Sequence, residues 1–121
     1  MEDSILFKTQ TESTAFKISG VTIGGRLGEN PTVLIGSLFY HRHKIVEDAT
    51  TGVFDRMKAE ALINRQDELA DMTGNPCMID LVCGSTEVLP KYLDFVTSIT
   101  DAPILMDGIT ASINMVGLDY A

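Results

Sequence analysis

Three apolar runs, separated by segments with helical spacing, constrain the fold more than any other feature of the chain. They lie at residues 32–37, 77–83 and 104–107, and each is long enough for one strand. A continuous apolar run of this length is typical of a strand buried on both faces, as in a parallel sheet. The alternation of strands and helices predicts an α/β fold with right-handed crossover connections.

The segments between the runs carry helix signals. The first reaches a good helix stop at Gly74 and has apolar residues at helical spacing. These residues are Phe54, Met57, Ala61, Leu62, Leu69 and Met72. The second begins with N-cap chemistry at residues 84–86 and carries an apolar stripe from Val88 to Ile99. After the third run the signal is weak, and we expect a third helix to begin near Leu118. We assign Met57, Met72, Met78 and Met106 to the core.

The N-terminal part has a different pattern. Residues 7–25 alternate apolar and polar side chains around Gly20, which predicts a β-hairpin. A turn-rich connector follows, and residues 40–52 read as a polar loop. We therefore expect a single domain over residues 1–121, with the hairpin and connector at 1–31 and the first βα units at 32–121.

An isolated sheet of three parallel strands has a physical problem. Both of its edges stay open and one face stays uncovered, which favours aggregation unless something pairs with it. A parallel (β/α) TIM barrel needs about 250 residues, so the simplest interpretation is the N-terminal part of such a barrel, with about three βα units. A split barrel completed by a second chain and a small doubly wound domain are the alternatives.

Charge and cysteine content exclude several classes. A net charge of −8 argues against a general binder of nucleic acid or anionic membranes. The sequence has neither a signal-peptide pattern nor an apolar run long enough for a membrane span. Cys77 and Cys83 flank one strand too far apart for a disulfide, so we expect buried, reduced thiols. These features predict a cytoplasmic protein, which is free to dock on a membrane complex.

Two aspartates are unusual because they interrupt or end apolar strands. Asp80 lies inside the second run and Asp107 ends the third, about one βα repeat later. An ionised carboxylate in such a place is costly unless it is paired or faces a ligand. We expect both at similar heights near the carboxyl ends of neighbouring strands, where barrels place their sites. A carboxylate that accepts paired hydrogen bonds suits the amino-pyrimidinone edge of a pterin. The alternative is a carboxylate that accepts loop N–H groups.

Two other motifs have a structural and a functional interpretation. His41 and His43 follow the first strand, as in barrels that bind a metal through His-x-His, but two imidazoles do not make a site. A loop whose histidines form hydrogen bonds is the favoured interpretation, and no metal site is predicted. Gly84 opens a strand-to-helix turn with free N–H groups, which either caps the helix or lines a ligand site.

Several runs of sequence resemble a known family. They are residues 28–37, 39–41, 44–48, 58–63, 73–77 and 100–103. They are similar to the family that comprises the H subunit of tetrahydromethanopterin S-methyltransferase and the methylcorrinoid:tetrahydrofolate methyltransferases. The resemblance covers nearly the whole chain after the first few residues and implies a TIM barrel.

The resemblance also implies an activity, in which a methyl group moves between N5 of a tetrahydropterin and the cobalt of a corrinoid. The pterin is tetrahydromethanopterin or tetrahydrofolate, and the corrinoid (cobalamin) is carried by a partner protein. Acidic residues of early strands hold the pterin in related barrels, and Asp80 and Asp107 match them. We add Gly84 and Asn114 as pterin-binding candidates, although residues 108–114 depart from the Ser/Pro/Thr-Gly-like turn of the family. We assign no catalytic residue.

The resemblance leaves other points open. A homodimer and a subunit of a methyltransferase complex are both compatible with it. The alternatives for function are an amidohydrolase-type barrel that uses His41 and His43, and a non-catalytic scaffold subunit for a corrinoid partner.

Overall fold

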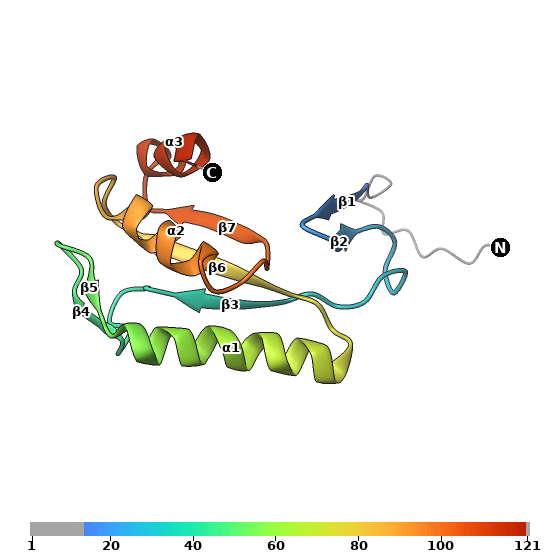
Figure 1. Ribbon diagram of the computed structural model, residues 1–121. Helices are drawn as coiled ribbons and strands as arrows, with labels where there is room; N and C mark the ends of the chain where they lie inside the picture. Colours follow the sequence, from blue (N-terminus) through green and yellow to red (C-terminus); the bar gives the residue numbers. More distant parts are fainter. Residues whose placement is uncertain (1–13, 121) are drawn as a thin grey trace.

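The computed structural model describes residues 14–120, which form a mixed α/β fold (Figure 1). In chain order the elements are β1 (Ala15–Ile18), β2 (Val21–Gly24), β3 (Leu34–Leu38), β4 (Val46–Asp48), β5 (Val53–Phe54), α1 (Arg56–Thr73), β6 (Cys77–Cys83), α2 (Leu89–Thr97), β7 (Ile104–Gly108) and α3 (Ala111–Tyr120). The α/β class is confirmed.

A three-stranded parallel sheet organises the fold. Its strand order is β3–β6–β7, with α1 connecting the first pair and α2 the second. All three predicted strands are therefore present and parallel, as the alternation of apolar runs indicates. The closed barrel needs further strands, so it remains a prediction, as does the single-domain organisation of residues 1–121.

Two short antiparallel hairpins lie beyond opposite ends of this sheet (Figure 1). The β1–β2 hairpin, beyond the amino ends of the strands, confirms the prediction for the described residues; residues 7–13 of that prediction lie outside them. Strand β4 falls where we predicted only a loop, and β5 contains Phe54, which we wrongly assigned to the following helix. The two strands have three and two residues, which is too short for the period of two to be recognisable.

Capping residues mark both ends of helix α1. The side chain of Asp55 accepts a hydrogen bond from the backbone N–H of Lys58, at 3.0 Å. At the other end Gly74 adopts a left-handed φ of 77° and donates its N–H to the carbonyl of Ala70. Such a C-terminal glycine has no Cβ to clash, so the predicted stop at Gly74 is confirmed.

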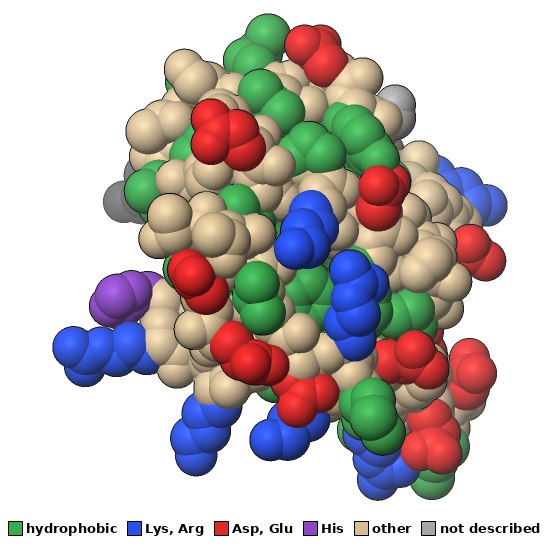
Figure 2. Space-filling view, turned by 60° about the vertical axis from the view of Figure 1, so that its left-hand side comes forward, with side chains coloured by type: hydrophobic (Ala, Val, Ile, Leu, Met, Phe, Trp, Pro, Cys, Tyr) green, Lys and Arg blue, Asp and Glu red, His purple; other side chains and the backbone are tan. Residues whose placement is uncertain are grey.

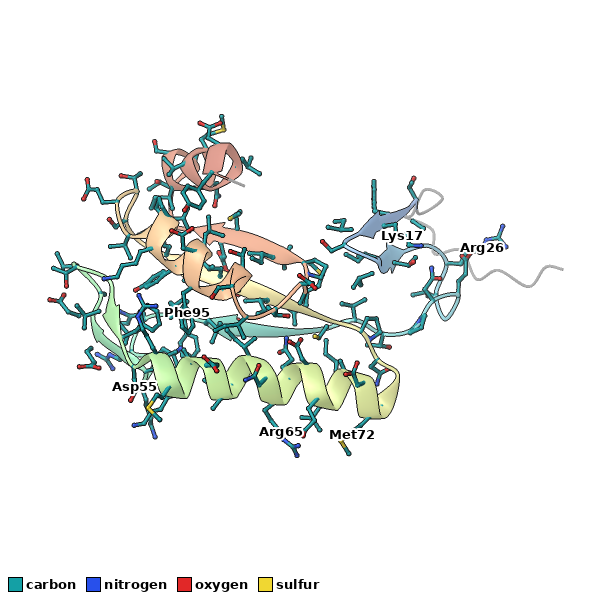
Figure 3. The ribbon with its side chains drawn as sticks, viewed as in Figure 1. Lys17, Arg26, Asp55, Arg65, Met72 and Phe95 are labelled. Atoms are coloured by element: carbon teal, nitrogen blue, oxygen red, sulfur yellow. The ribbon has the colours of Figure 1, made fainter. Side chains whose placement is uncertain are left out.

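The buried face of α1 is not the predicted one. Ala59 and Ile63 are its buried residues, whereas Met57 and Met72 are 85% and 72% exposed. At about 100° per residue, Met57 lies roughly 200° from Ala59 and Met72 roughly 180° from Ile63. Figure 3 shows Met72 pointing away from the sheet. The assignment of Met57 and Met72 to the core was therefore wrong, whereas Met78 is buried and Met106 packs against the core.

The core lies between β6 and α2. Leu81 and Val96 are completely buried, and Leu89 is 1% exposed. Before α2 the Ser85 hydroxyl accepts hydrogen bonds from the N–H groups of Glu87 and Val88, at 3.2 and 3.4 Å. The predicted turn is therefore present, but its serine closes the turn and does not cap the helix: the N-cap position of α2 is Val88, which makes no side-chain cap hydrogen bond. Cys77 and Cys83 are buried free thiols, as expected.

Two strand and helix predictions need correction. β3 was expected to be buried on both faces, but Leu34 and Ile35 are about half exposed. The cause is its place at the edge of the described sheet, with β6 in the centre. Helix α3 begins at Ala111, earlier than the predicted start at Leu118. Gly117 obscured it, yet a Cβ there would lie 2.8 Å from Met106 Sδ, so close packing requires this glycine.

We predict very different losses of stability for two truncations of similar size. Leu81→Ala should lower the free energy of unfolding by about 2–5 kcal/mol, because it leaves a cavity in the core. Met57→Ala is the matched control and should change it by less than about 0.5 kcal/mol, because Met57 is exposed. Denaturant unfolding of the full-length protein measures both. Equal losses would contradict the placement of the core.

Candidate functional site

The two faces of the parallel sheet differ in what covers them. A Cβ at Gly36 of β3 would collide with Gln66 of α1, and a Cβ at Gly108 of β7 with Ile113 of α3. These positions therefore face the helices. Side chains alternate along a strand, so the next positions point to the opposite face, which none of the described helices covers.

Three polar side chains share this uncovered face. Ser37 is the register partner of Asp80, and its Oγ donates a hydrogen bond to Asp80 Oδ2 at 2.8 Å. Asp107 lies on the neighbouring strand β7, opposite Val82. We did not predict Ser37. Ser37 is the polar side chain of the run 32–37 that falls in register with Asp80. That register appears only in the structure, so the sequence offered no clear signal for Ser37.

Asp80 and Asp107 interact directly. The pKa of Asp107 is raised, because its side chain is hydrogen bonded to Asp80 and because the Asp80 charge repels a second negative charge. The two carboxyl groups therefore lie close enough to influence each other's charge. The two acids lie on neighbouring strands at similar heights, as predicted, with Asp107 one side-chain position closer to the carboxyl ends than Asp80.

The pair is open to solvent and has no described cationic partner. Asp107 is exposed and Asp80 half-buried, and no salt bridge within residues 14–120 joins a Lys or Arg to either. Figure 2, which brings the carboxyl-end side of the molecule forward, shows acidic and basic side chains interspersed. Solvent screens the repulsion in the pair. Its free oxygens can accept hydrogen bonds from a planar donor.

The structure places Gly84 at the carboxyl end of β6, in an exposed turn. A Cβ there would touch only Ile109 Cδ1, at an ordinary 3.5 Å. In the turn that it opens, the Ser85 hydroxyl accepts a hydrogen bond from the N–H of Glu87. Contact between Gly84 and a ligand remains a prediction.

Asn114 has a structural task. From α3, its Oδ1 accepts a hydrogen bond from the backbone N–H of Gly108 at 2.8 Å. This contact fixes the end of β7 directly after Asp107. The carbonyl oxygen of Asn114 is thus committed to the backbone, and a role for its side chain in pterin binding remains a prediction.

The comparisons with known proteins agree with one another. The family model for the tetrahydromethanopterin S-methyltransferase MtrH subunit matches residues 11–121. The H subunit of tetrahydromethanopterin S-methyltransferase from Methanothermobacter marburgensis is 45% identical over 96% of this chain and 37% of its own length. That of Methanococcus aeolicus is 46% identical over 91% of this chain and 34% of its own length. The chain belongs to the MtrH family.

One of the relatives that the chain matches has another name. The H subunit of the putative methyltransferase mtx from Methanosarcina mazei is 46% identical over 84% of this chain and 33% of its own length. The chain spans about a third of the length of the curated relatives that it matches. None of the helices between residues 14 and 120 is long and apolar enough to cross a membrane.

His43 has a structural role in the loop after β3. It is 9% exposed, its ring stacks on Tyr40 at 4.2 Å, and its Nδ1 accepts a hydrogen bond from the N–H of Phe39 at 3.0 Å. Phe39 has a left-handed φ of 65°, which is rare for a bulky residue. The hydrogen-bonding interpretation of the loop is confirmed for His43. His41 is exposed, and the described residues contain no group of three or more metal-binding side chains.

We predict that Asp107→Asn changes stability in a pH-dependent way. The raised pKa means that the folded chain binds a proton more tightly than the unfolded chain, so stability falls as pH rises from the ordinary Asp range through the raised pKa. The variant removes the repulsion and should melt slightly higher than wild type above that window, and at the same temperature below it. Salt should reduce the difference, because Asp107 is exposed.

Thermal unfolding at a series of pH values measures this effect. Asp119→Asn, which removes the same charge from an exposed position on α3, is the control. A difference between Asp107→Asn and wild type that stays constant down to the lowest pH would show that the raised pKa is not its source.

We predict a second pH effect at His43. Burial lowers the pKa of His43 below the ordinary value of 6.5. The stability that neutral His43 contributes is therefore present above pH 6.5 and is lost as pH falls from 6.5 through the lowered pKa. His43→Leu leaves the buried Phe39 N–H without an acceptor, which should cost about 1–3 kcal/mol at neutral pH. It should also abolish this pH dependence.

Denaturant unfolding at neutral and mildly acidic pH tests the His43 prediction. His41→Leu is the matched control, because His41 is an exposed histidine of the same loop. Equal losses in both variants would rule out a particular role for the His43 hydrogen bond.

Proposed function

We propose that this chain is the pterin-binding part of a methyltransferase that moves a methyl group between N5 of a tetrahydropterin and the cobalt of a corrinoid on a separate protein. The observation that carries the proposal is the pairing of Asp80 and Asp107 on the uncovered face of the parallel sheet. Membership of the MtrH family supports the reaction class.

The pairing suits the chemistry of a pterin ring. Its amino-pyrimidinone edge presents adjacent N–H donors in one plane, and a carboxylate presents two acceptors in one plane. Asp80 is held by Ser37 and Asp107, so its carboxylate has a defined direction before a ligand arrives. A ring bound by this edge has its N5 at the other end, where it is available to the cobalt.

The reaction requires no covalent intermediate on the protein. The corrinoid supplies the cobalt that accepts or returns the methyl group, by displacement at carbon. As the bond between N5 and the methyl carbon breaks, its electron pair stays on N5. The protein has to align N5 and cobalt and to stabilise this charge through hydrogen bonds or a proton. In the proposal Asp80 and Asp107 orient the ring.

We further propose that the sheet belongs to a (β/α) barrel whose interior is its uncovered face. Ile35 and Leu105 are apolar yet about half exposed on that face, and both sheet edges are open among the described strands. The curated relatives are about three times as long as this chain, which is the size a barrel requires. The acidic pair would then lie inside, toward the carboxyl-end mouth.

The names of the relatives favour tetrahydromethanopterin as the carrier over tetrahydrofolate. They also favour a role as one subunit of a larger methyltransferase, with the corrinoid protein as partner and with peripheral docking on that assembly. A homodimer of the chain is compatible with this arrangement.

We predict that each aspartate contributes to pterin affinity. Asp80→Asn and Asp107→Ala in the full-length protein should each weaken tetrahydromethanopterin binding by about 10- to 100-fold, because each removes a hydrogen bond to the ring. Asp101→Asn, at the amino end of β7, is the control and should bind normally. Titration followed by calorimetry measures the affinity. Unchanged affinity in both site variants would remove the pair from the site.

A second assay separates catalysis from scaffolding. Demethylation of a methylated corrinoid protein on addition of the pterin can be followed by its absorption spectrum. A catalytic subunit accelerates this change, whereas a scaffold that only holds the corrinoid protein leaves the rate unaltered.

A further inference from the structure

We propose that Ser37 is a positioning residue that makes the acidic pair asymmetric, with Asp80 kept as the ionised acceptor and Asp107 as the residue that carries the shared proton. The pair then offers a ligand one acceptor and one donor side by side. The consequence for the ligand rests on the proposed function, whereas the position of the proton does not.

The hydrogen bonds of the pair provide the first step. Ser37 Oγ donates to Asp80 Oδ2 at 2.8 Å, and Asp80 is also hydrogen bonded to Asp107. A hydrogen bond donated to a carboxylate stabilises its charged form. Ser37 is the register partner of Asp80 and not of Asp107, so the hydroxyl favours ionisation of one member of the pair only.

Proton counting gives the second step. Two carboxyl groups that share a hydrogen bond need one proton between them. Since the Ser37 hydroxyl already donates to Asp80, that proton resides on Asp107. The raised pKa of Asp107, caused first by its hydrogen bond to Asp80 and then by the Asp80 charge, agrees with this direction.

Neighbouring groups do not oppose this division. The uncovered face of the three described strands consists of alternate residues of β3, β6 and β7. They are Ile35, Ser37, Met78, Asp80, Val82, Leu105 and Asp107. Only the two aspartates among them titrate, and none is basic. Among these residues, Ser37 is the one whose hydroxyl donates a hydrogen bond to one acid of the pair, Asp80.

An asymmetric pair selects a particular kind of ligand edge. An ionised Asp80 accepts from an N–H group, whereas a protonated Asp107 donates to a carbonyl or ring nitrogen. An amino-pyrimidinone has both kinds of group on one edge. Its affinity should fall as pH rises through the deprotonation of Asp107, because the donor is then lost and a second negative charge appears.

The matched variants Ser37→Thr and Ser37→Val test the proposal. The two side chains have nearly the same shape, but only threonine retains the hydroxyl. The side-chain carboxyl carbons of Asp80 and Asp107 are followed by ¹³C NMR during a pH titration of the full-length protein. In wild type and Ser37→Thr, the first proton taken up as pH falls should appear mainly at Asp107. In Ser37→Val, the ratio of protonated Asp107 to protonated Asp80 should fall about tenfold.

Two results would overturn the proposal: a proton mainly on Asp80 in wild type, or the same distribution in Ser37→Val as in Ser37→Thr. Amide spectra of the variants show whether both are folded, and Ser37→Ala replaces the valine variant if it is not. A merely structural role of Ser37 would affect stability without redistributing the proton.

Pterin affinity as a function of pH separates this proposal from the proposed function. Redistribution of the proton in Ser37→Val without any pterin binding to wild type supports the role of Ser37 and refutes the function. Normal pterin binding with an unchanged proton distribution refutes the role of Ser37 and leaves the function intact.

Discussion

The rest of the structure depends on the alternation of side chains along the central strand β6. Ile79 and Leu81 point to the helices and form the core with α2, so Asp80 between them has to emerge on the opposite face. Parallel pairing then brings residues of β3 and β7 beside it at fixed register. The same two-residue alternation of side chains along β6 thus places the core residues on one face and the carboxylate of the site on the other. A slip of one residue in register would bury the acid and expose the leucine.

Sequence patterns identified what depends on local chemistry and long apolar runs. The three strands, the stop at Gly74 and the turn at Ser85 are of this kind. The buried face of α1 was missed because Met57 and Met72 are apolar residues that follow a helical period without facing the sheet. The start of helix α3 was predicted too late because Gly117, a poor helix former, is required there by packing against Met106. Packing across elements has no local signal, so it overrides propensity where the two differ.

The candidate site shows the same division. Asp80 and Asp107 were predictable, because charge inside an apolar run is costly and therefore conspicuous. Ser37 was not, because a serine near the end of a strand is common and its significance comes only from the register with β6. The offset in height between the two acids also follows from register, which the spacing of apolar runs does not specify to one residue.

The loop after β3 connects this site to the carboxyl-end rim. Phe39 follows Ser37 by two residues, adopts a left-handed conformation, and stacks on Tyr92 of α2 at 3.9 Å, while His43 accepts its N–H. Such strain persists only where surrounding contacts determine it, and here they fix the strand end that carries Ser37. Enclosure of the uncovered face would remove water from Asp107, and burial raises the pKa of a carboxyl group. Closing the proposed barrel would therefore strengthen the asymmetry that Ser37 establishes, so that the enclosed pair presents one donor and one acceptor over a wider range of pH.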